Sequence, residues 1–351
     1  MVFQKIFHSG LAGVLLTLLS ASFAADPLVQ LHKGDHVAIV GSGLADRQQH
    51  HGWLEALIHK ANPEAQLTFR NLGFAADEIN LHPRSADVPP TEYFLSMKKG
   101  DSPAKHNPGI IYKAGTDFGA DVIFAYWGFN ESFRGPAGLE QFKSNLGAYL
   151  EAQLSVKYNG KEAARIVLFS PIAQENLKNP DFSDGEANNA NLALYTKAMA
   201  EVAQAKKVPF VDLFTPSRDL FAKASAPLTI NGIHLTEEGD RQLAPVQFKA
   251  LFGIDAPPTN DPLVGKIRAA VLDKNTEWHH RYRTVDQFNI YGDRSRGAYE
   301  GVINAVTLGV EMAQRDVKTA NRDLRVWAVA KGGDLKVTDD NLPPVPPVPL
   351  R

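Results

Sequence analysis

The feature that most constrains the fold of this chain is a regular alternation of short apolar runs with amphipathic stretches. The apolar runs are five or six residues long, rich in β-branched and aromatic residues, and almost uninterrupted by polar ones. This pattern is typical of parallel strands that are buried on both faces of a sheet. The runs are found at residues 36–40, 66–70, 121–126, 165–169 and 208–212.

Amphipathic stretches with a helical spacing of apolar residues lie between and after these runs. They cover residues 50–61, 139–156, 188–206 and 237–253. Thr236 is placed to cap the last of them. Strands that alternate with helices predict a doubly wound α/β sheet. In such sheets ligands bind outside the carboxyl ends of the strands, so the loops after the strands are the expected place for a site.

The N-terminus has the pattern of an export signal. Lys5 is the only charge before an apolar run, and the small residues Ser22 and Ala24 precede a cleavage point. The run is shorter than the roughly 20 residues of a membrane span, which disfavours the alternative of an uncleaved anchor. We therefore expect residues 1–25 to be a signal peptide and the mature protein to be exported to a periplasmic or extracellular location.

Changes in composition divide the rest of the chain. Residues 26–253 form the predicted α/β domain, and residues 254–263, which contain three prolines, are predicted to be a linker. Residues 264–325 are expected to form a mainly helical extension that is interrupted near 291–297. Residues 326–351 are proline-rich and are expected to be an extended tail.

Composition also excludes several classes of function. The 351-residue chain has a formal net charge of −2, whereas a nucleic-acid binder usually has a strongly basic face. The absence of cysteine excludes disulfides, thiolate metal sites and c-type haem attachment. There is no HExxH motif, and residues 41–47 lack the lysine of a phosphate-binding loop. We predict no metal, no cofactor, no nucleic-acid partner and no membrane span after signal removal.

Four loops carry short motifs in a set order along the chain. The motifs are GSGL at 41–44, NLG at 71–73, GFNE at 128–131 and NGIH at 231–234. In this order they resemble the blocks of the SGNH/GDSL hydrolase superfamily, over roughly residues 34–253. The whole chain is similar to a group of exported SGNH-like proteins from planctomycetes and their relatives. The resemblance implies ester hydrolysis and a flavodoxin-like, three-layer α/β/α sandwich with a short parallel sheet of order 2-1-3-4-5, to which the helical C-terminal extension is added.

The resemblance also implies roles for individual residues. His234 corresponds to the general base. The N–H groups of Gly43 and Gly73 and the side-chain amide of Asn130 correspond to the donors that stabilise the oxyanion. The aspartate that orients the histidine in the family corresponds to Asn231, which is neutral.

The nucleophile block departs from the family pattern, because the position of the nucleophilic serine corresponds to Gly43. Ser42 is adjacent, but a shift of one residue re-aims the hydroxyl, and a misplacement of 1 Å already costs about 10²-fold in rate. We expect the Ser42 hydroxyl to bond the backbone of the turn, and the Cα of Gly43 to lie within about 9 Å of the His234 ring. A positive φ at Gly43 would hinder a serine at that position.

Two functions fit these motifs. The first is hydrolysis of acyl esters of an exported carbohydrate, with either Ser42 or a water molecule as the attacking group. The second is carbohydrate binding by a catalytically inactive relative, which Gly43 and Asn231 favour. Both functions imply a small-molecule or glycan ligand.

Polar residues near the same edge of the sheet, and in the extension, are predicted to contact the ligand. The extension contributes candidates because residues 275–297 combine four arginines with four aromatic residues, a composition suited to sugars and carboxylates. The predicted contacts are Asp46, Arg47, His50, Glu131, Arg134, Gln174, Arg281 and Arg283. His279 and His280 are adjacent and would point about 100° apart on a helix, which does not favour a shared metal ion.

Overall fold

The structure is a computed structural model. It describes residues 26–83, 91–96, 102–103, 111–112, 118–283, 288–299 and 301–344. The predicted signal peptide and the last part of the proline-rich tail lie outside the described residues. Among the residues described, no helix is both long and apolar enough to cross a membrane.

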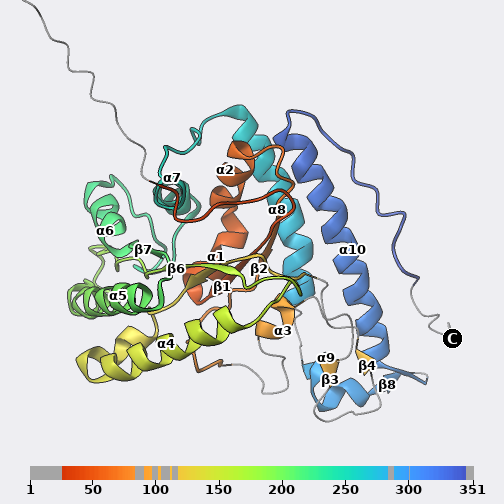
Figure 1. Ribbon diagram of the computed structural model, residues 1–351, viewed down its shortest axis with the longest axis horizontal. Helices are drawn as coiled ribbons and strands as arrows, with labels where there is room; N and C mark the ends of the chain where they lie inside the picture. Colours follow the sequence, from red (N-terminus) through yellow and green to blue (C-terminus); the bar gives the residue numbers. More distant parts are fainter. Residues whose placement is uncertain are drawn as a thin grey trace, which may run out of the picture.

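A five-stranded parallel sheet forms the centre of the molecule (Figure 1). Its strands are β1 (His36–Gly41), β2 (Thr68–Asn71), β5 (Val122–Tyr126), β6 (Arg165–Phe169) and β7 (Phe210–Val211). The strands lie in the order β2-β1-β5-β6-β7, which confirms the predicted order 2-1-3-4-5. The first and third predicted strands are direct neighbours, since Val37 pairs with Val122. Because every pair is parallel, all five strands end at one edge of the sheet.

Helices cover both faces of the sheet and confirm the three-layer sandwich (Figure 1). The main helices of this domain are α2 (Trp53–Ala61), α4 (Leu139–Ser155), α5 (Glu186–Lys206), α6 (Phe214–Lys223) and α7 (Glu237–Phe252). Side chains of β1 alternate between two cores, as the period of a strand requires. Val37 and Ile39 face the core with α2 and α7, whereas Ala38 and Val40 face the core with α4 and α5.

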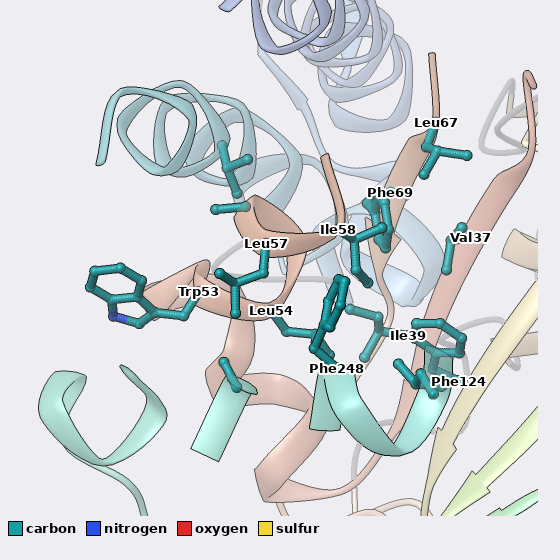
Figure 2. Packing of buried hydrophobic residues seen from close by; sticks show 14 of the residues in the cluster. Val37, Ile39, Trp53, Leu54, Leu57, Ile58, Leu67, Phe69, Phe124 and Phe248 are labelled. Atoms are coloured by element: carbon teal, nitrogen blue, oxygen red, sulfur yellow. The ribbon is translucent and has the colours of Figure 1, made fainter. Parts of the chain in front are cut away.

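The core between α2, α7 and the sheet is closely packed (Figure 2). Leu54 and Ile58 of α2 lie with Ile39 and Phe124 of the sheet and with Phe248 of α7. All five side chains are exposed by 5% or less. Since burial of a large apolar side chain contributes about 1.5–3 kcal/mol, this core fixes α2 and α7 firmly on the sheet.

The first helical segment is divided where one continuous helix was predicted over residues 50–61. Helix α1 (Gly43–His51) begins directly after β1 and ends at Gly52. Gly52 has a φ of 69°, a left-handed conformation that suits glycine, and its N–H bonds the carbonyl of Gln48. Helix α2 then starts at Trp53, directly after Gly52. The helix that carries Arg47 therefore starts at the carboxyl edge of the sheet.

The C-terminal extension consists mainly of two long helices that lie side by side (Figure 1). They are α8 (Pro262–Tyr282) and α10 (Asn304–Ala330). Short elements between them, α9 (Phe288–Tyr291), η2 (Asp293–Arg296), β8 (Ala298–Tyr299) and β9 (Val302–Ile303), interrupt the helices where the sequence predicts. Helix α10 continues past the predicted boundary at residue 325 and ends at Ala330.

The extension covers the edge strand β2 and is bonded to it. Arg70 of β2 forms a two-point ion pair with Asp323 of α10, with N–O distances of 3.1 and 2.6 Å. Lys274 of α8 pairs with Glu55 of α2 at 2.6 Å, and both side chains are buried. Removing one partner of a buried pair usually costs about 3–5 kcal/mol. The extension is thus part of the same folded body as the sheet.

The remaining short elements lie in the loops of the α/β domain. They are α3 (Thr91–Leu95), β3 (Ser102–Pro103), β4 (Ile111–Tyr112) and the 3₁₀ segment η1 (Glu131–Gly138). Neither these elements nor α6 was predicted, since each is short or lacks a clear apolar period.

Candidate active site

The turn from β1 into α1 is fixed by close backbone contact with β5. Gly41 has a φ of 130°, and a Cβ there would lie 2.0 Å from the carbonyl oxygen of Tyr126. The next N–H, from Ser42, donates to that same carbonyl at 3.1 Å. Only glycine fits at position 41, so the turn delivers residues 42–44 to the carboxyl edge of the sheet.

The loop before α7 carries His234 and is held by one buried carboxylate. Glu175, which is 5% exposed, accepts hydrogen bonds from the N–H groups of Leu228 and Thr229 and from the Thr229 hydroxyl. The N–H of Glu175 in turn donates to the carbonyl of Gly232 at 2.8 Å. These bonds tie the loop to the segment after β6. The sequence does not show this role of Glu175, because it depends on contacts more than fifty residues away.

The start of α7 follows the predicted pattern. The hydroxyl of Thr236 accepts a hydrogen bond from the N–H of Gly239 at 3.0 Å, which confirms Thr236 as the N-cap. His234 is therefore placed two residues before a capped helix, on a loop that is bonded at both ends.

Asn231 fixes the tautomer of His234. The Oδ1 atom of Asn231 accepts the backbone N–H of His234 at 3.0 Å and lies 3.1 Å from the ring Nδ1. Because a backbone N–H can only donate, the atom that faces it is the amide oxygen, and Nδ1 must carry the proton toward it. The ring Nε2 is then left with a free lone pair, which is the form a general base needs.

The free nitrogen of His234 faces position 43. A Cβ built on Gly43 would lie 3.2 Å from Nε2 and 3.6 Å from Cδ2 of that ring. This confirms the expected proximity of Gly43 to His234. The concern about a positive φ is removed, because Gly43 is the first residue of α1 and is not among the glycines with positive φ.

The hydroxyl of Ser42 is not bonded to His234 in this geometry. Its side chain is 3% exposed and lines the cavity described below. Within the described part of the chain its hydroxyl makes no hydrogen bond, either to His234 or to the backbone. The expected bond from Ser42 to the turn is therefore wrong, while its separation from His234 is as expected.

The predicted oxyanion hole is only partly available. The N–H of Gly73 donates to Oδ1 of Asn71 at 2.8 Å, and Gly73 does not line the cavity. The prediction for Gly73 is corrected on this ground. Asn130 lines the cavity, but its Nδ2 already donates to the carbonyl of Asp77 at 2.9 Å.

The start of α1 supplies other donors. The first N–H groups of a helix have no acceptor within the helix. The first bond of α1 runs from the N–H of Asp46 to the carbonyl of Ser42, so the N–H groups of Gly43 and Leu44 precede it. Gly43 and Leu44 both line the cavity, where these groups can stabilise negative charge.

A cavity of about 280 Å³ lies between α1 and the His234 loop. Its sides are mainly apolar. We define the apolar wall as Trp127, Phe129, Phe133, Ile172 and Ile233. The aromatic residues in the loop after β5 are the part of this wall that is visible in the sequence, because the wall is assembled from three separate loops.

Electrostatics keep His234 neutral near pH 7. Burial, followed by the nearby charge of Arg47, lowers the pKa of His234 below its ordinary value of 6.5, and Asp46 opposes the shift. Arg47 also lines the cavity, and its Nε lies 3.3 Å from the carbonyl of Leu235. The cavity therefore combines a neutral base with a permanent cation.

Asp46, Arg283 and His50 come together behind the cavity rather than in its wall. Arg283 pairs with Asp46 at 2.7 Å, and its guanidinium lies 3.5 Å from the ring centroid of Phe74. The exposed His50 ring lies 5.2 Å from that of His279. These three predicted contacts thus support the turn and α1 and do not line the cavity.

Glu131 and Arg134 also have other partners. Glu131 is buried and accepts the N–H groups of Ile79 and Gly128, both at 3.1 Å, and burial raises its pKa to about 7. Arg134 is half exposed and pairs with Glu78 at 2.8 Å. Glu131 therefore shapes the loop that carries Asn130, and neither side chain lines the cavity.

Gln174 and Arg281 lie away from the cavity as well. Gln174 bonds Asn188 at 3.0 Å and lines a separate, more polar groove. Arg281 of α8 is 1% exposed and pairs with Asp316 of α10 at 2.9 Å. The prediction of Arg281 as a ligand contact is corrected, because its guanidinium holds the two helices of the extension together.

Among the residues that the structure describes, no group of three or more His, Asp or Glu side chains is arranged to hold a metal ion.

Comparisons with known proteins place this geometry in context. A model of the GDSL-like Lipase/Acylhydrolase family matches residues 34–242. A search of curated proteins found no match.

Several solved structures are similar to the chain at low identity. A gut microbial diltiazem-metabolizing enzyme is 16% identical with a TM-score of 0.45; the match covers 65% of this chain and only 48% of that enzyme. A catalytic mutant of an acetylxylan esterase from Geobacillus stearothermophilus is 12% identical, with a TM-score of 0.44 and coverage of 64% and 96%. The native aryl esterase of M. smegmatis is 17% identical, with a TM-score of 0.41 and coverage of 62% and 100%.

Proposed function

The chain belongs to the GDSL-like lipase/acylhydrolase family, and from this we propose that it hydrolyses ester bonds with His234 as general base and water as the attacking group. The observation that carries the proposal is the pairing of Gly43 with the free Nε2 of His234. A Cβ at position 43 would lie 3.2 Å from Nε2, so the backbone of Gly43 lies directly beside the base. In this proposal Gly43 corresponds to the family's serine, and a water molecule in the cavity, bonded to Nε2, takes the part of the serine hydroxyl.

The chemistry follows from this arrangement. Nε2 of His234 takes a proton from the water as the water oxygen forms a bond to the ester carbonyl carbon. The carbonyl oxygen becomes an oxyanion, which the N–H groups of Gly43 and Leu44 at the start of α1 stabilise. The C–O bond to the alcohol then breaks, and Nε2 returns the proton to the leaving oxygen. The products are a carboxylic acid and an alcohol.

The substrate is proposed to be an acyl ester of an exported carbohydrate. The export signal predicted for residues 1–25 supports the location, and the apolar wall suits the acyl part of such an ester. The alcohol part would lie at the mouth of the cavity, near the exposed Phe133.

A second proposed function is ligand binding without catalysis, and it is favoured by the glycine at position 43 and the asparagine at position 231. Gly43 has no nucleophilic side chain, and Asn231 gives His234 no charge with which to stabilise an imidazolium. Both favour a relative that binds an acylated carbohydrate without turnover.

Hydrolysis of aryl acetates and acetylated glycans by the purified protein separates the two. We expect turnover that falls by about 10²–10⁴-fold in His234→Ala, the usual contribution of a general base. His280→Ala, which changes an exposed histidine outside the cavity, is the matched control. Absence of turnover together with glycan binding would favour the non-catalytic function.

A further inference from the structure

Among the described residues that line the cavity, Arg47 is the one with a permanently charged side chain. Its Nε bonds the carbonyl of Leu235 at 3.3 Å, which anchors the guanidinium. Its two terminal nitrogens have no ion-pair or hydrogen-bond partner in the part of the chain that the structure describes. The nearest carboxylate along the chain, Asp46, is taken by Arg283 at 2.7 Å. The buried Asp240 is close enough for its charge to interact with that of Arg47, but burial raises the pKa of Asp240 to about 7 and no ion pair joins the two side chains in the described part of the chain. The terminal nitrogens of Arg47 are therefore available to an anion in the cavity.

The position of Arg47 on α1 directs it to the reacting end of the cavity. Arg47 follows Gly43 by four residues, so both lie on the same face of the helix. Arg47 and His234 both line the cavity, and they are close enough for the charge of Arg47 to lower the pKa of His234. The first N–H groups of the helix lie at the same end and also favour an anion.

Ser42 gives an independent indication that a polar ligand group belongs at this end. Its side chain is 3% exposed and lines the cavity, and its hydroxyl has no partner among the residues described. Its oxygen is not among the buried atoms that lack a partner, so it is open to the cavity, where a ligand can bond it. The hydroxyl is therefore placed to donate to the same anion as Arg47.

The rest of the cavity is apolar, which limits what the anion can be attached to. The apolar wall provides three aromatic and two isoleucine side chains and no charge. A volume of about 280 Å³ is near the lower limit of roughly 300 Å³ for small-molecule sites, so the ligand is small. A sulfate or a free sugar would leave this wall unused.

We propose that the cavity binds small amphipathic carboxylates, with the carboxylate paired to Arg47 and bonded to Ser42, and the hydrocarbon part against the apolar wall. This names the acid half of the ester and, to that extent, rests on the proposed function. The acid released by hydrolysis would leave its carboxylate at this point. Binding of the free acid is nevertheless measured without any turnover.

The test is calorimetric titration of the full-length mature chain with octanoate and with octanamide, which has a similar shape but no charge. Octanoate is expected to bind at least about tenfold more tightly, since a hydrogen bond to a charged group supports such a difference. Arg47→Gln is expected to weaken octanoate binding by the same factor and to leave octanamide unchanged. Arg47→Lys retains the charge and is expected to recover part of the affinity.

Arg325→Gln is the matched control, because it removes one positive charge from α10 at a place outside the cavity. It is expected to bind octanoate as the wild type does. Thermal unfolding of each variant verifies that it is folded, and Arg47→Lys serves in place of Arg47→Gln for the comparison if the latter does not fold.

Equal affinity for octanoate and octanamide would overturn the proposal, as would unchanged octanoate binding in the Arg47 variants or no binding by the wild type at millimolar octanoate. Failure of the proposed function looks different. If octanoate binds as expected and no ester is hydrolysed, the hydrolase is excluded and the carboxylate site remains. If esters are hydrolysed and octanoate does not bind, only the carboxylate site is excluded.

Discussion

Gly43 and Gly73 lie at the carboxyl ends of the neighbouring strands β1 and β2, yet their missing side chains face different surroundings. A Cβ on Gly73 would lie 2.5 Å from the backbone nitrogen of Asp46 and 2.7 Å from the carbonyl carbon of Ala45. A Cβ on Gly43 would meet only the ring of His234, at 3.2 Å or more. Backbone cannot move aside, whereas a half-buried ring can.

The difference separates a packing requirement from an open functional position. Gly73 lets the end of β2 approach the first turn of α1, and Asn71 locks this contact by bonding the carbonyl of Ala45 at 2.6 Å. Gly43 has no comparable neighbour and an ordinary helical conformation, so the fold does not require glycine there. Two glycines in adjacent motifs of one site can therefore have unrelated physical causes.

The largest predicted effect is the difference in stability between alanine variants of Gly73 and Gly43. Gly73→Ala should destabilise the protein by about 3 kcal/mol, the upper end of the usual cost of overpacking, since the added methyl meets backbone. Gly43→Ala is the matched variant and should cost less than about 1 kcal/mol. Chemical denaturation followed by circular dichroism measures both. Equal losses of stability would show that the two glycines are under the same constraint.

The next effect concerns the chemistry at position 43. Gly43→Ser should place a hydroxyl beside Nε2 of His234 and create a nucleophile that reacts with a fluorophosphonate ester. Intact-protein mass spectrometry should show one adduct on this variant and none on the wild type. Turnover of an aryl acetate should rise by about tenfold or more, since covalent catalysis divides one difficult step into two easier ones.

The double variant Gly43→Ser/His234→Ala is the control for that experiment and should not form an adduct. An adduct on the wild type that is lost in Ser42→Ala would contradict the assignment, because it would make Ser42 the nucleophile.

The smallest effect is expected from restoring the charge beside His234. In the wild type, kcat/KM should fall as the pH drops through the pKa of His234, which lies below 6.5, because only the neutral ring is a base. Asn231→Asp adds a negative charge that favours the imidazolium and raises the pKa of His234. The acidic limb of the pH profile, over which kcat/KM falls, should therefore move to higher pH by roughly half a unit. The pH dependence of aryl-ester hydrolysis measures the shift. A limb that stays in place would mean that His234 does not set the acid side of the profile.

The strands and their order could be predicted because they depend on local composition. The continuous apolar runs at β1, β5 and β6 mark strands that are buried on both faces, and each was located within about one residue. The break at Gly52 was not predicted, since a glycine within an amphipathic pattern ends a helix only when its φ becomes positive. The two helices of the extension were predicted as helical, but their contact with β2 was not.

The site was predictable in its chain positions and not in its contacts. The order of the motifs indicated His234 and Gly43, and the structure brings the two together. The sequence does not show that the N–H of Gly73 is used by Asn71, or that Arg281 is paired with Asp316, because these contacts depend on packing. Of the eight predicted ligand contacts, Arg47 is the one that lines the cavity, and only the surrounding helices decide this.

The bonds from α8 to the site have a consequence for the order in which the protein is made. Trp278 donates to the carbonyl of Asn71 at 2.6 Å, and Tyr282 donates to that of Leu72 at 3.0 Å, across separations of 207 and 210 residues. A ribosome releases the β2 turn long before it reaches these two side chains, and contacts of such long range form late. A nascent chain that ends before residue 282 contains all four motifs, but the turn after β2 lacks the hydrogen bond from Tyr282 to the carbonyl of Leu72. Premature termination in α8 therefore yields a chain that has every motif residue but lacks the two bonds that hold the carbonyls of Asn71 and Leu72.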